Sequence, residues 1–359
     1  MAGAAGTLSL LAELHARIGA EGPLTVAQYM EVALFHPRLG YYAARDPLGA
    51  RGDFVTAPEI SQVFGELIGL CCADYWRRIG APDPVLLVEL GPGRGTMLRD
   101  ALRAARVAPG FCAAARLHLV ERSPALRAAQ ERALAAPSPA WHDDIDTVPP
   151  GPMLLVANEF LDALPVRQFM RHAGAWRERR VGLDAGGGLS FVLDEAPAAI
   201  ALPEAPEGAV REVCEGADHL ARAIAARLLA AGGAALFVDY GYFPEAFGDT
   251  LQAVRRHRRH DVLTAPGEAD LTAHVDFAAF AAAAAAAGAR AWGPVPQGEF
   301  LAALGIEARA QKLIAGADPN QAMLVRSGCR RLVDPAEMGT LFKALALTPP
   351  GAPAPAGFA

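Results

Sequence analysis

The chain has few lysines and no overall excess of positive charge. Lys312 and Lys343 are its only lysines, so nearly all of its 33 basic residues are arginine, and its formal net charge is −6. An acidic balance argues against a broad nucleic-acid-binding surface. The basic run Arg255–His260 is a local exception, which we predict to be a solvated loop.

The chain also lacks the cysteine and histidine patterns of disulfide frameworks and metal centres. Its five cysteines form no C-x-x-C and its nine histidines show no metal-ligand spacing, a pattern typical of a reducing compartment. Met1–Leu14 lacks the charge and apolar pattern of a secretory signal, and the apolar stretch Ala278–Ala287 is too short to span a bilayer. We therefore expect a cytoplasmic protein with no metal site and no integral membrane segment.

The length and the periodicity indicate an α/β protein. A chain of 359 residues can hold one large α/β domain with an insertion, or two domains. Apolar runs alternate with helical patterns from residue 85 onward, which predicts a doubly wound, mostly parallel sheet. The predicted strands are 85–90, 117–120, 141–145, 153–157, 234–240 and 321–326. The predicted helices lie within 7–35, with Thr25 as a cap, and at 62–79, 96–106, 124–135, 208–231 and 276–287.

The alternation breaks after the fourth predicted strand. Between Pro165 and Leu193, polar, β-branched and aromatic residues and a triple glycine predict one or two antiparallel hairpins. We therefore divide the chain into four regions. Residues 1–80 are predicted to hold N-terminal helices with an active-site lid loop, and residues 81–164 and 233–347 to form the core. Residues 165–232 are predicted to form an inserted α+β subdomain for substrate or partner, and residues 348–359 a disordered tail rich in Pro, Gly and Ala.

The strongest functional signal is the run VLLVELGPGRGT. Its apolar part predicts a buried strand, and Gly91, Gly93 and Gly95 predict a tight turn where the backbone approaches a ligand. Thr96 stands where the dinucleotide motif G-x-G-x-x-G requires its third glycine, and Glu89 is poorly suited to an anionic pyrophosphate. A carboxylate suits the ammonium and sulfonium of S-adenosylmethionine (SAM), so the run predicts a methyl-donor site.

Acidic and polar residues follow the other predicted strands. Glu121, Asp143 or Asp144, and Asn158 with Glu159 lie at carboxyl ends, at the edge where open α/β sheets bind ligands. Glu121 is suited to accept hydrogen bonds from the ribose hydroxyls of the cofactor, and Asp143 from the adenine amino group. Each of these residues alone could be a solvated strand-end residue, but their joint placement favours a cofactor site that includes Asn158.

Seven segments form a specific combination: Phe35–Pro37, Gly40–Tyr42, Gly52–Glu59, Glu89–Gly95, Asn158–Pro165, Asp239–Gly241 and Asp270–Phe277. In this order they resemble the MidA-like family of SAM-dependent methyltransferases, over about residues 30–345. The resemblance implies a class I SAM-dependent methyltransferase fold, Rossmann-like, with SAM at the glycine loop and a lid over 40–61 that includes Thr56. It also implies a protein substrate, because the mitochondrial member methylates an arginine of a complex I core subunit during assembly.

The segment Asn158–Pro165 supports an arginine acceptor on chemical grounds as well. A guanidinium keeps its proton at neutral pH and is a poor nucleophile. Two carboxylates that bind it bidentately would orient it toward the methyl group and draw its positive charge to one side. Glu159 and Asp162 are the candidates for this clamp. The alternative is that Asp162 caps a helix while Glu159 alone faces the site.

Two further candidate residues have structural alternatives. His274 is of a residue type suited to accept the proton released on methylation, but it could instead be a buried histidine bonded to Asp270 or Asp276. Thr56 and Ser61 could equally be helix caps before the helix predicted at 62–79.

Other functions compete with arginine methylation. A small-molecule methyltransferase fits the same fold if the insertion at 165–232 encloses a compact pocket, and a non-catalytic SAM-binding assembly factor fits it too. A nicotinamide oxidoreductase is disfavoured, because Thr96 replaces the required glycine and no tyrosine is followed four residues later by lysine. No motif predicts the oligomeric state.

Overall fold

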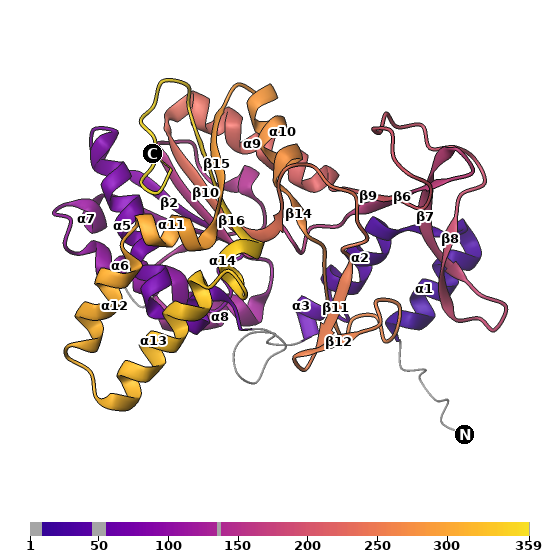
Figure 1. Ribbon diagram of the computed structural model, residues 1–359, viewed down its shortest axis with the longest axis horizontal. Coiled ribbons are helices and arrows are strands. Elements are labelled where there is room, and N and C mark those ends of the chain that lie inside the picture. Colours follow the sequence, from indigo (N-terminus) through magenta and orange to yellow (C-terminus); the bar gives the residue numbers. More distant parts are fainter. Residues whose placement is uncertain (1–8, 45–54, 135–137, 359) are drawn as a thin grey trace. The chain divides into compact units, whose positions relative to one another are not determined.

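The computed structural model describes residues 9–44, 55–134 and 138–358 (Figure 1). The chain divides into two compact units. The first consists of Met1–Phe54, Ala163–Gly216 and Ala246–Ala273, and the second consists of Val55–Asp162, Ala217–Glu245 and His274–Ala359. The first unit thus joins most of the predicted insertion at 165–232 with the N-terminal helices and with residues 246–273. Residues 45–54 of the lid predicted at 40–61 lie outside the described residues.

The second unit is built around one large sheet with the strand order β15-β16-β10-β5-β2-β3-β4. Its strands are β2 (Val85–Leu90), β3 (Ala115–Val120), β4 (Ala140–His142), β5 (Met153–Asn158), β10 (Gly233–Tyr242), β15 (Arg290–Pro296) and β16 (Phe342–Thr348), and β14 (Val275–Asp276) pairs with the end of β10. Strands from β4 to β10 are parallel, whereas β16 is antiparallel to both of its neighbours. The predicted mostly parallel sheet is confirmed.

The chain reverses the direction of sheet growth between β2 and β5. It proceeds outward from β2 through β3 and β4, and then continues on the other side of β2 with β5 and β10. Leu90 at the end of β2 lies beside Ala157 near the end of β5. The carboxyl ends of these two strands therefore flank the reversal point, which is where open α/β sheets bind ligands.

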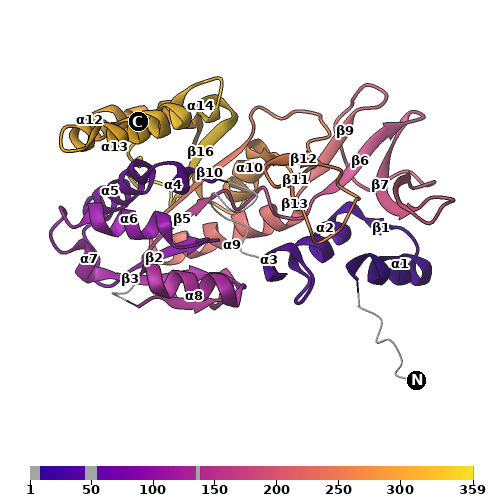
Figure 2. The ribbon, with the colours of Figure 1, turned by 90° about the horizontal axis from the view of Figure 1, so that it is seen from below.

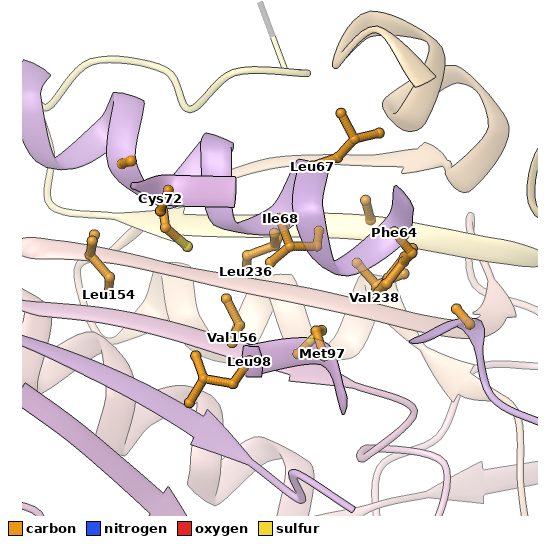
Figure 3. Packing of buried hydrophobic residues seen from close by; sticks show 14 of the residues in the cluster. Phe64, Leu67, Ile68, Cys72, Met97, Leu98, Leu154, Val156, Leu236 and Val238 are labelled. Carbon is orange, nitrogen blue, oxygen red and sulfur yellow. The ribbon is translucent and has the colours of Figure 1, made fainter. Parts of the chain in front are cut away.

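Helices cover both faces of this sheet (Figures 1 and 2). They are α4 (Ala57–Ile60), α5 (Gln62–Arg78), α6 (Thr96–Ala105), α7 (Phe111–Ala114), α8 (Pro124–Ala133), the 3₁₀ turn η1 (Ile145–Thr147), α9 (Glu215–Ala231) and α10 (Phe277–Ala286). Figure 3 shows apolar side chains of α5 over those of β5 and β10. On the opposite face, the rings of Phe237 and Phe280 lie 4.7 Å apart, so α10 covers that side.

The close packing of α5 on α6 depends on a glycine. A Cβ at Gly69 would lie 2.3 Å from the carbonyl oxygen of Ala101, so a side chain there would force the helices apart. Since α6 begins at the glycine loop, this contact helps to fix the position of that loop against the core.

The C-terminal region differs from the sequence prediction. It contains α11 (Gln297–Ala303), α12 (Ile306–Ile314), α13 (Pro319–Val333) and α14 (Met338–Leu341). The strand predicted at 321–326 is wrong, because Asp318 and Gln321 form a capping box that starts α13. The predicted tail at 348–358 is packed instead, since the Phe358 ring lies 5.2 Å from that of Phe300 and Arg78 donates to the Ala354 carbonyl.

The first unit combines short helices with two antiparallel sheets. Its helices are α1 (Leu10–Glu21), α2 (Val26–Phe35) and α3 (Tyr41–Ala44); one sheet contains β1 (Leu24–Thr25), β6 (Arg167–His172), β7 (Ala175–Leu183), β8 (Leu189–Leu193) and β9 (Val210–Val213), and the other contains β11 (Gln252–Arg255), β12 (Arg258–His260) and β13 (Asp270–Thr272). The predicted hairpins are confirmed by the β6-β7-β8 pairing. The helix predicted at 208–231 begins only at Glu215, because β9 pairs with β6.

The cap predicted at the start of α2 is also confirmed. The Thr25 hydroxyl accepts from the Gln28 amide, and the Gln28 side chain accepts from the Thr25 amide in return. Among the described helices, none combines the length and apolar character needed to cross a bilayer.

Candidate active site

The glycine loop after β2 has the backbone geometry that its sequence predicts. Gly91, Gly93 and Gly95 have φ angles of 60°, 53° and 79°, in the left-handed region that glycine adopts without a steric penalty. The Gly95 amide donates to the Pro92 carbonyl at 2.8 Å, which closes the turn, and α6 begins at the next residue. The loop therefore presents bare backbone at the carboxyl edge of the sheet.

Glu89, near the end of β2, is a buried carboxyl group without full hydrogen bonding. Its side chain is 2% exposed, and burial raises its pKa to about 8. Within the described residues, its Oε2 atom has no hydrogen-bond partner. A buried polar atom in this state is costly, so an unoccupied acceptor at this position indicates a ligand-binding atom.

Asn158 adds a second buried acceptor at the same edge. Its Oδ1 atom likewise has no partner among the described residues. Glu89 lies beside Val156 in the sheet register, and Asn158 follows Val156 by two residues, so both polar side chains project from the same sheet face. Two unoccupied acceptors on one face, at the reversal point of the sheet, suit a ligand that carries positive charge and hydrogen-bond donors.

Glu121, after β3, is tied to the glycine loop through a residue that sequence reasoning missed. Its carboxylate accepts from the Ser123 amide at 2.8 Å and from the Gln130 side chain at 3.3 Å, and burial raises its pKa. The fully buried Gln130 also donates to the Gly93 carbonyl at 2.7 Å and accepts from the Trp141 indole at 2.8 Å. The network holds the acidic strand end and the glycine loop in one arrangement.

The two acidic residues after β4 have different environments. The Asp143 side chain is 77% exposed and pairs with Arg127 at 2.6 Å, and Arg127 in turn donates to the Glu121 carbonyl at 2.7 Å. Asp144 instead accepts from the Asp146 amide and caps η1. Of the two, Asp143 is the one linked to the Glu121 network.

The segment before α5 contacts the glycine loop through a residue other than Thr56. Thr56 precedes α4 and its side chain makes no capping hydrogen bond, whereas the Ser61 hydroxyl accepts from the Val63 amide and caps α5. The Thr96 hydroxyl donates to Glu59 Oε1 at 2.5 Å. Thr96, which stands in place of the third glycine of a dinucleotide motif, therefore links α6 to α4.

Glu159 follows β5 in a strained conformation. Its φ angle is 49°, which is uncommon for a residue other than glycine, and its amide donates to the Val238 carbonyl at 2.9 Å. Its Oε1 atom accepts from the Ala57 amide at 2.9 Å and from the Asn158 side chain at 3.0 Å. Burial, and next the nearby Asp162 carboxylate, raise its pKa to about 7.

Asp239, on β10, organises the loop that carries Glu159. Its Oδ2 atom accepts from the amides of Phe160, Leu161 and Asp162 at 2.8–3.3 Å, and its Oδ1 atom accepts from the Tyr240 amide at 2.9 Å. Burial first, and then Asp162 and Glu159, raise the pKa of Asp239. The loop after β5 thus gathers three carboxyl groups around a fixed backbone.

His274 lies beside Tyr240, with the two rings edge to face and their centroids 5.5 Å apart. Burial, and then Lys343, lower the pKa of His274, which favours the neutral ring at pH 7. Of the two acidic residues considered as its partners, Asp276 caps α10 and Asp270 accepts from the Tyr42 hydroxyl. Within the described residues, no group of three or more His, Cys, Asp and Glu side chains could hold a metal ion.

Comparison with known proteins defines the class of this site. Residues 67–295 match a family described as "Putative S-adenosyl-L-methionine-dependent methyltransferase". A Burkholderia thailandensis protein crystallised with S-adenosyl-homocysteine has a TM-score of 0.83 and 30% identity, over 97% of this chain and 93% of its own. The chain therefore belongs to the S-adenosyl-L-methionine-dependent methyltransferase family, and SAM is its cofactor.

The named relatives cover almost the whole chain. The protein arginine methyltransferase NDUFAF7 homolog of Drosophila melanogaster, a mitochondrial protein, is 40% identical over 95% of this chain and 85% of its own length. The human protein arginine methyltransferase NDUFAF7, also mitochondrial, is 36% identical over 95% of this chain and 83% of its own. The resemblance expected from the seven motifs is confirmed, and the enzyme is a SAM-dependent methyltransferase.

Proposed function

We propose that the protein N-methylates an arginine of a protein substrate. The observation that carries the proposal is the loop after β5, where Asp239 fixes the backbone that presents Glu159 and Asp162. A fixed pair of carboxyl groups suits a guanidinium, which is planar and binds carboxylates through two parallel hydrogen bonds. The relatives at 40% and 36% identity carry the name protein arginine methyltransferase, which agrees with this acceptor.

The cofactor side of the proposed site uses the unoccupied acceptors. We assign Glu89 and Asn158 to the cationic and donor groups of the methionine part of SAM, because both present buried oxygen atoms that have no partner among the residues that the structure describes. Glu121 would accept from the ribose hydroxyls and Asp143 would lie near the adenine, while the bare backbone of the glycine loop allows close approach. Thr56 is assigned to the same side, at the start of α4.

The acceptor side would act by orientation and charge. SAM supplies an electrophilic methyl group when it is bound, so this chain's residues have to aim a nitrogen lone pair and accommodate a proton. Glu159 and Asp162 would hold one edge of the guanidinium, which leaves the opposite terminal nitrogen as the nucleophile. His274, neutral at pH 7 because burial lowers its pKa, would accept the proton released after transfer.

The acceptor protein we propose is a subunit of respiratory complex I, with methylation occurring in the cytoplasm during assembly. The similarity to the MidA-like family supports this acceptor. All five cysteines lie in the described part of the chain, and none of them forms a disulfide.

The proposal is tested by incubating the purified enzyme with isotope-labelled SAM and two acceptor pools. One pool is the protein fraction of cells that lack the enzyme, and the other is a metabolite extract stripped of protein. Label on an arginine of a protein, located by mass spectrometry, is the expected result. Label confined to a small molecule would overturn the arginine assignment and favour the small-molecule alternative.

A further inference from the structure

The hairpin formed by β11 and β12 concentrates basic side chains. Four arginines and two histidines occupy Arg255–His260, and no acidic residue lies between Asp249 and Asp261. The whole chain carries a net charge of −6, so this cluster differs in sign from its background. Such segregation of charge is a typical feature of an electrostatic recognition surface.

The basic side chains at the tip face solvent. Arg256, His257, Arg258 and Arg259 are all exposed, whereas Arg255 is partly buried and pairs with Glu268. In the described part of the chain, no ion pair involves Arg258 or Arg259. Strand β12 is also the outer strand of its three-stranded sheet. The arginines therefore lie along a sheet edge at which a further strand could pair.

The turn of this hairpin has an unusual composition. Arg255 pairs with Arg258, so Arg256 and His257 form a two-residue turn, and their φ angles are 52° and 60°. Two-residue turns of this kind strongly favour Asn-Gly, because both central residues adopt the left-handed conformation. Arg256 and His257 therefore add positive charge at the cost of an unfavourable backbone conformation. Unfavourable conformations of this kind are often found at functional sites.

We propose that the β11–β12 hairpin docks an acidic, extended segment of the acceptor protein; the identity of this partner rests on the proposed function. Arginine side chains bind carboxylates bidentately, and an extended segment can pair with an exposed edge strand through its backbone. The edge strand β12 also offers backbone hydrogen bonds, which an extended peptide can use but a nucleic acid or an anionic membrane surface cannot. Six residues on a chain of net negative charge fit a short acidic segment better.

Docking on the first unit would raise the effective concentration of the acceptor arginine at the catalytic unit. The contact would therefore affect the KM for a protein acceptor and leave the chemical step unchanged. Short peptides that carry the target arginine without the acidic segment would be insensitive to it.

The binding test uses the full-length protein without SAM and a fluorescein-labelled decaglutamate peptide, followed by fluorescence anisotropy at low salt. The double variant Arg258→Glu/Arg259→Glu is compared with Arg222→Glu/Arg326→Glu. The control pair lies on α9 and α13, is also exposed, and changes the net charge equally. Wild type and control should bind the peptide, and the hairpin variant should bind at least tenfold more weakly. Thermal unfolding confirms that each variant is folded.

Several results would overturn the proposal. Equal weakening in both double variants would show a general charge effect, and tighter binding of single-stranded RNA or of phosphatidylglycerol vesicles would show another partner class. If wild type does not bind the peptide, the arginines would serve only to prevent the edge strand from pairing with other chains. In transfer assays on an unmethylated protein acceptor of this enzyme, the hairpin variant should show a higher KM and an unchanged kcat. If no protein is methylated, the proposed function is contradicted. The peptide-binding result still tests the docking proposal, because it does not depend on methyl transfer.

Discussion

Two glutamates lie at the carboxyl ends of neighbouring strands, and they differ in hydrogen bonding. Glu89 is buried near the end of β2, and Glu159 is partly buried just after β5. Glu89 has a pKa raised to about 8 by burial, and its Oε2 atom has no partner in the described part of the chain. Glu159 after β5 has a pKa raised to about 7, but its Oε1 atom accepts two hydrogen bonds, from Ala57 and Asn158.

This difference separates the two halves of the proposed site. An unbonded buried carboxyl group gains most from a ligand that supplies donors and positive charge, which describes the cofactor side. A carboxyl group already held by the protein is preorganised, and preorganised groups contribute to the transition state rather than to ground-state binding alone. We therefore expect Glu89 to govern SAM affinity and Glu159 to govern transfer.

The largest expected effect comes from Glu159→Gln. The amide keeps the size of the side chain but loses the negative charge that would orient the guanidinium, so kcat for arginine methylation should fall on the order of 10³-fold. The SAM dissociation constant should stay within about threefold of wild type, because the cofactor side is intact. Steady-state kinetics and calorimetry on the same preparation measure both quantities. An unchanged kcat would remove Glu159 from the clamp.

The next effect concerns Asp239, which holds the Glu159 loop. Asp239→Ala leaves the amides of Phe160, Leu161 and Asp162 without their acceptor. We expect a loss of about 2–4 kcal/mol in unfolding free energy and a roughly hundredfold lower kcat. Asp239→Asn retains one oxygen atom and should be milder in urea unfolding and in transfer assays. Equal effects of both variants would contradict the role of the hydrogen bonds.

The pH dependence of SAM binding sharpens the comparison. Burial raises the pKa of Glu89 from 4.5 to about 8, so this group is protonated at pH 7 in the ligand-free protein. Cationic SAM favours the ionised form, and affinity should therefore increase with pH, by at most about tenfold per unit, until pH 8. Calorimetry between pH 6 and 8.5 measures this slope. In Glu89→Gln, any pH dependence that comes from titration of SAM itself should remain. The part of the slope of affinity against pH that comes from Glu89 should be lost.

The same shift has a consequence for stability. Between pH 4.5 and about 8 the folded protein holds the Glu89 proton while the unfolded chain does not, so Glu89 lowers the unfolding free energy as pH rises through this window. Denaturant unfolding of the ligand-free protein should show this decline, and Glu89→Gln should flatten it. A steeper decline in the variant would contradict the assignment.

The smallest effect is expected at Thr96. Thr96→Val removes the hydrogen bond to Glu59 with little change of shape, which should weaken SAM binding by about threefold to tenfold, or about 1 kcal/mol. A double-mutant cycle with Glu59→Gln tests the contact, because the two effects should not add. Additive effects would mean that the α4–α6 link is unimportant for the cofactor loop.

Local patterns predicted most of the core of this fold and the strand-end positions of several candidate site residues. The glycine loop and the strand ends at Glu89, Glu121 and Asn158 follow from residue types next to one another in the chain. Gln130 and Asp239 act across 37 and 77 or more residues, on Gly93 and on the loop before Pro165, so no local pattern could predict these contacts. The available signal for Asp239 was its place in the motif segment Asp239–Gly241, at the end of an apolar run.

The misassigned segments have a physical explanation as well. Residues 321–326 carry apolar side chains with little helical signal, and the capping box at Asp318 decides the helix. Residues 210–213 became a strand because β6 offers them an edge. In both places the deciding interaction involves residues outside the segment whose periodicity suggested the element.

The most direct test of this account is calorimetric titration of SAM into wild type, Glu89→Gln and Glu159→Gln at pH 8. The account predicts that Glu89→Gln weakens binding by about 10–100-fold, whereas Glu159→Gln binds as wild type does. The reverse order, or equal losses in both folded variants, would contradict the division of the site into a cofactor side at β2 and an acceptor side at β5.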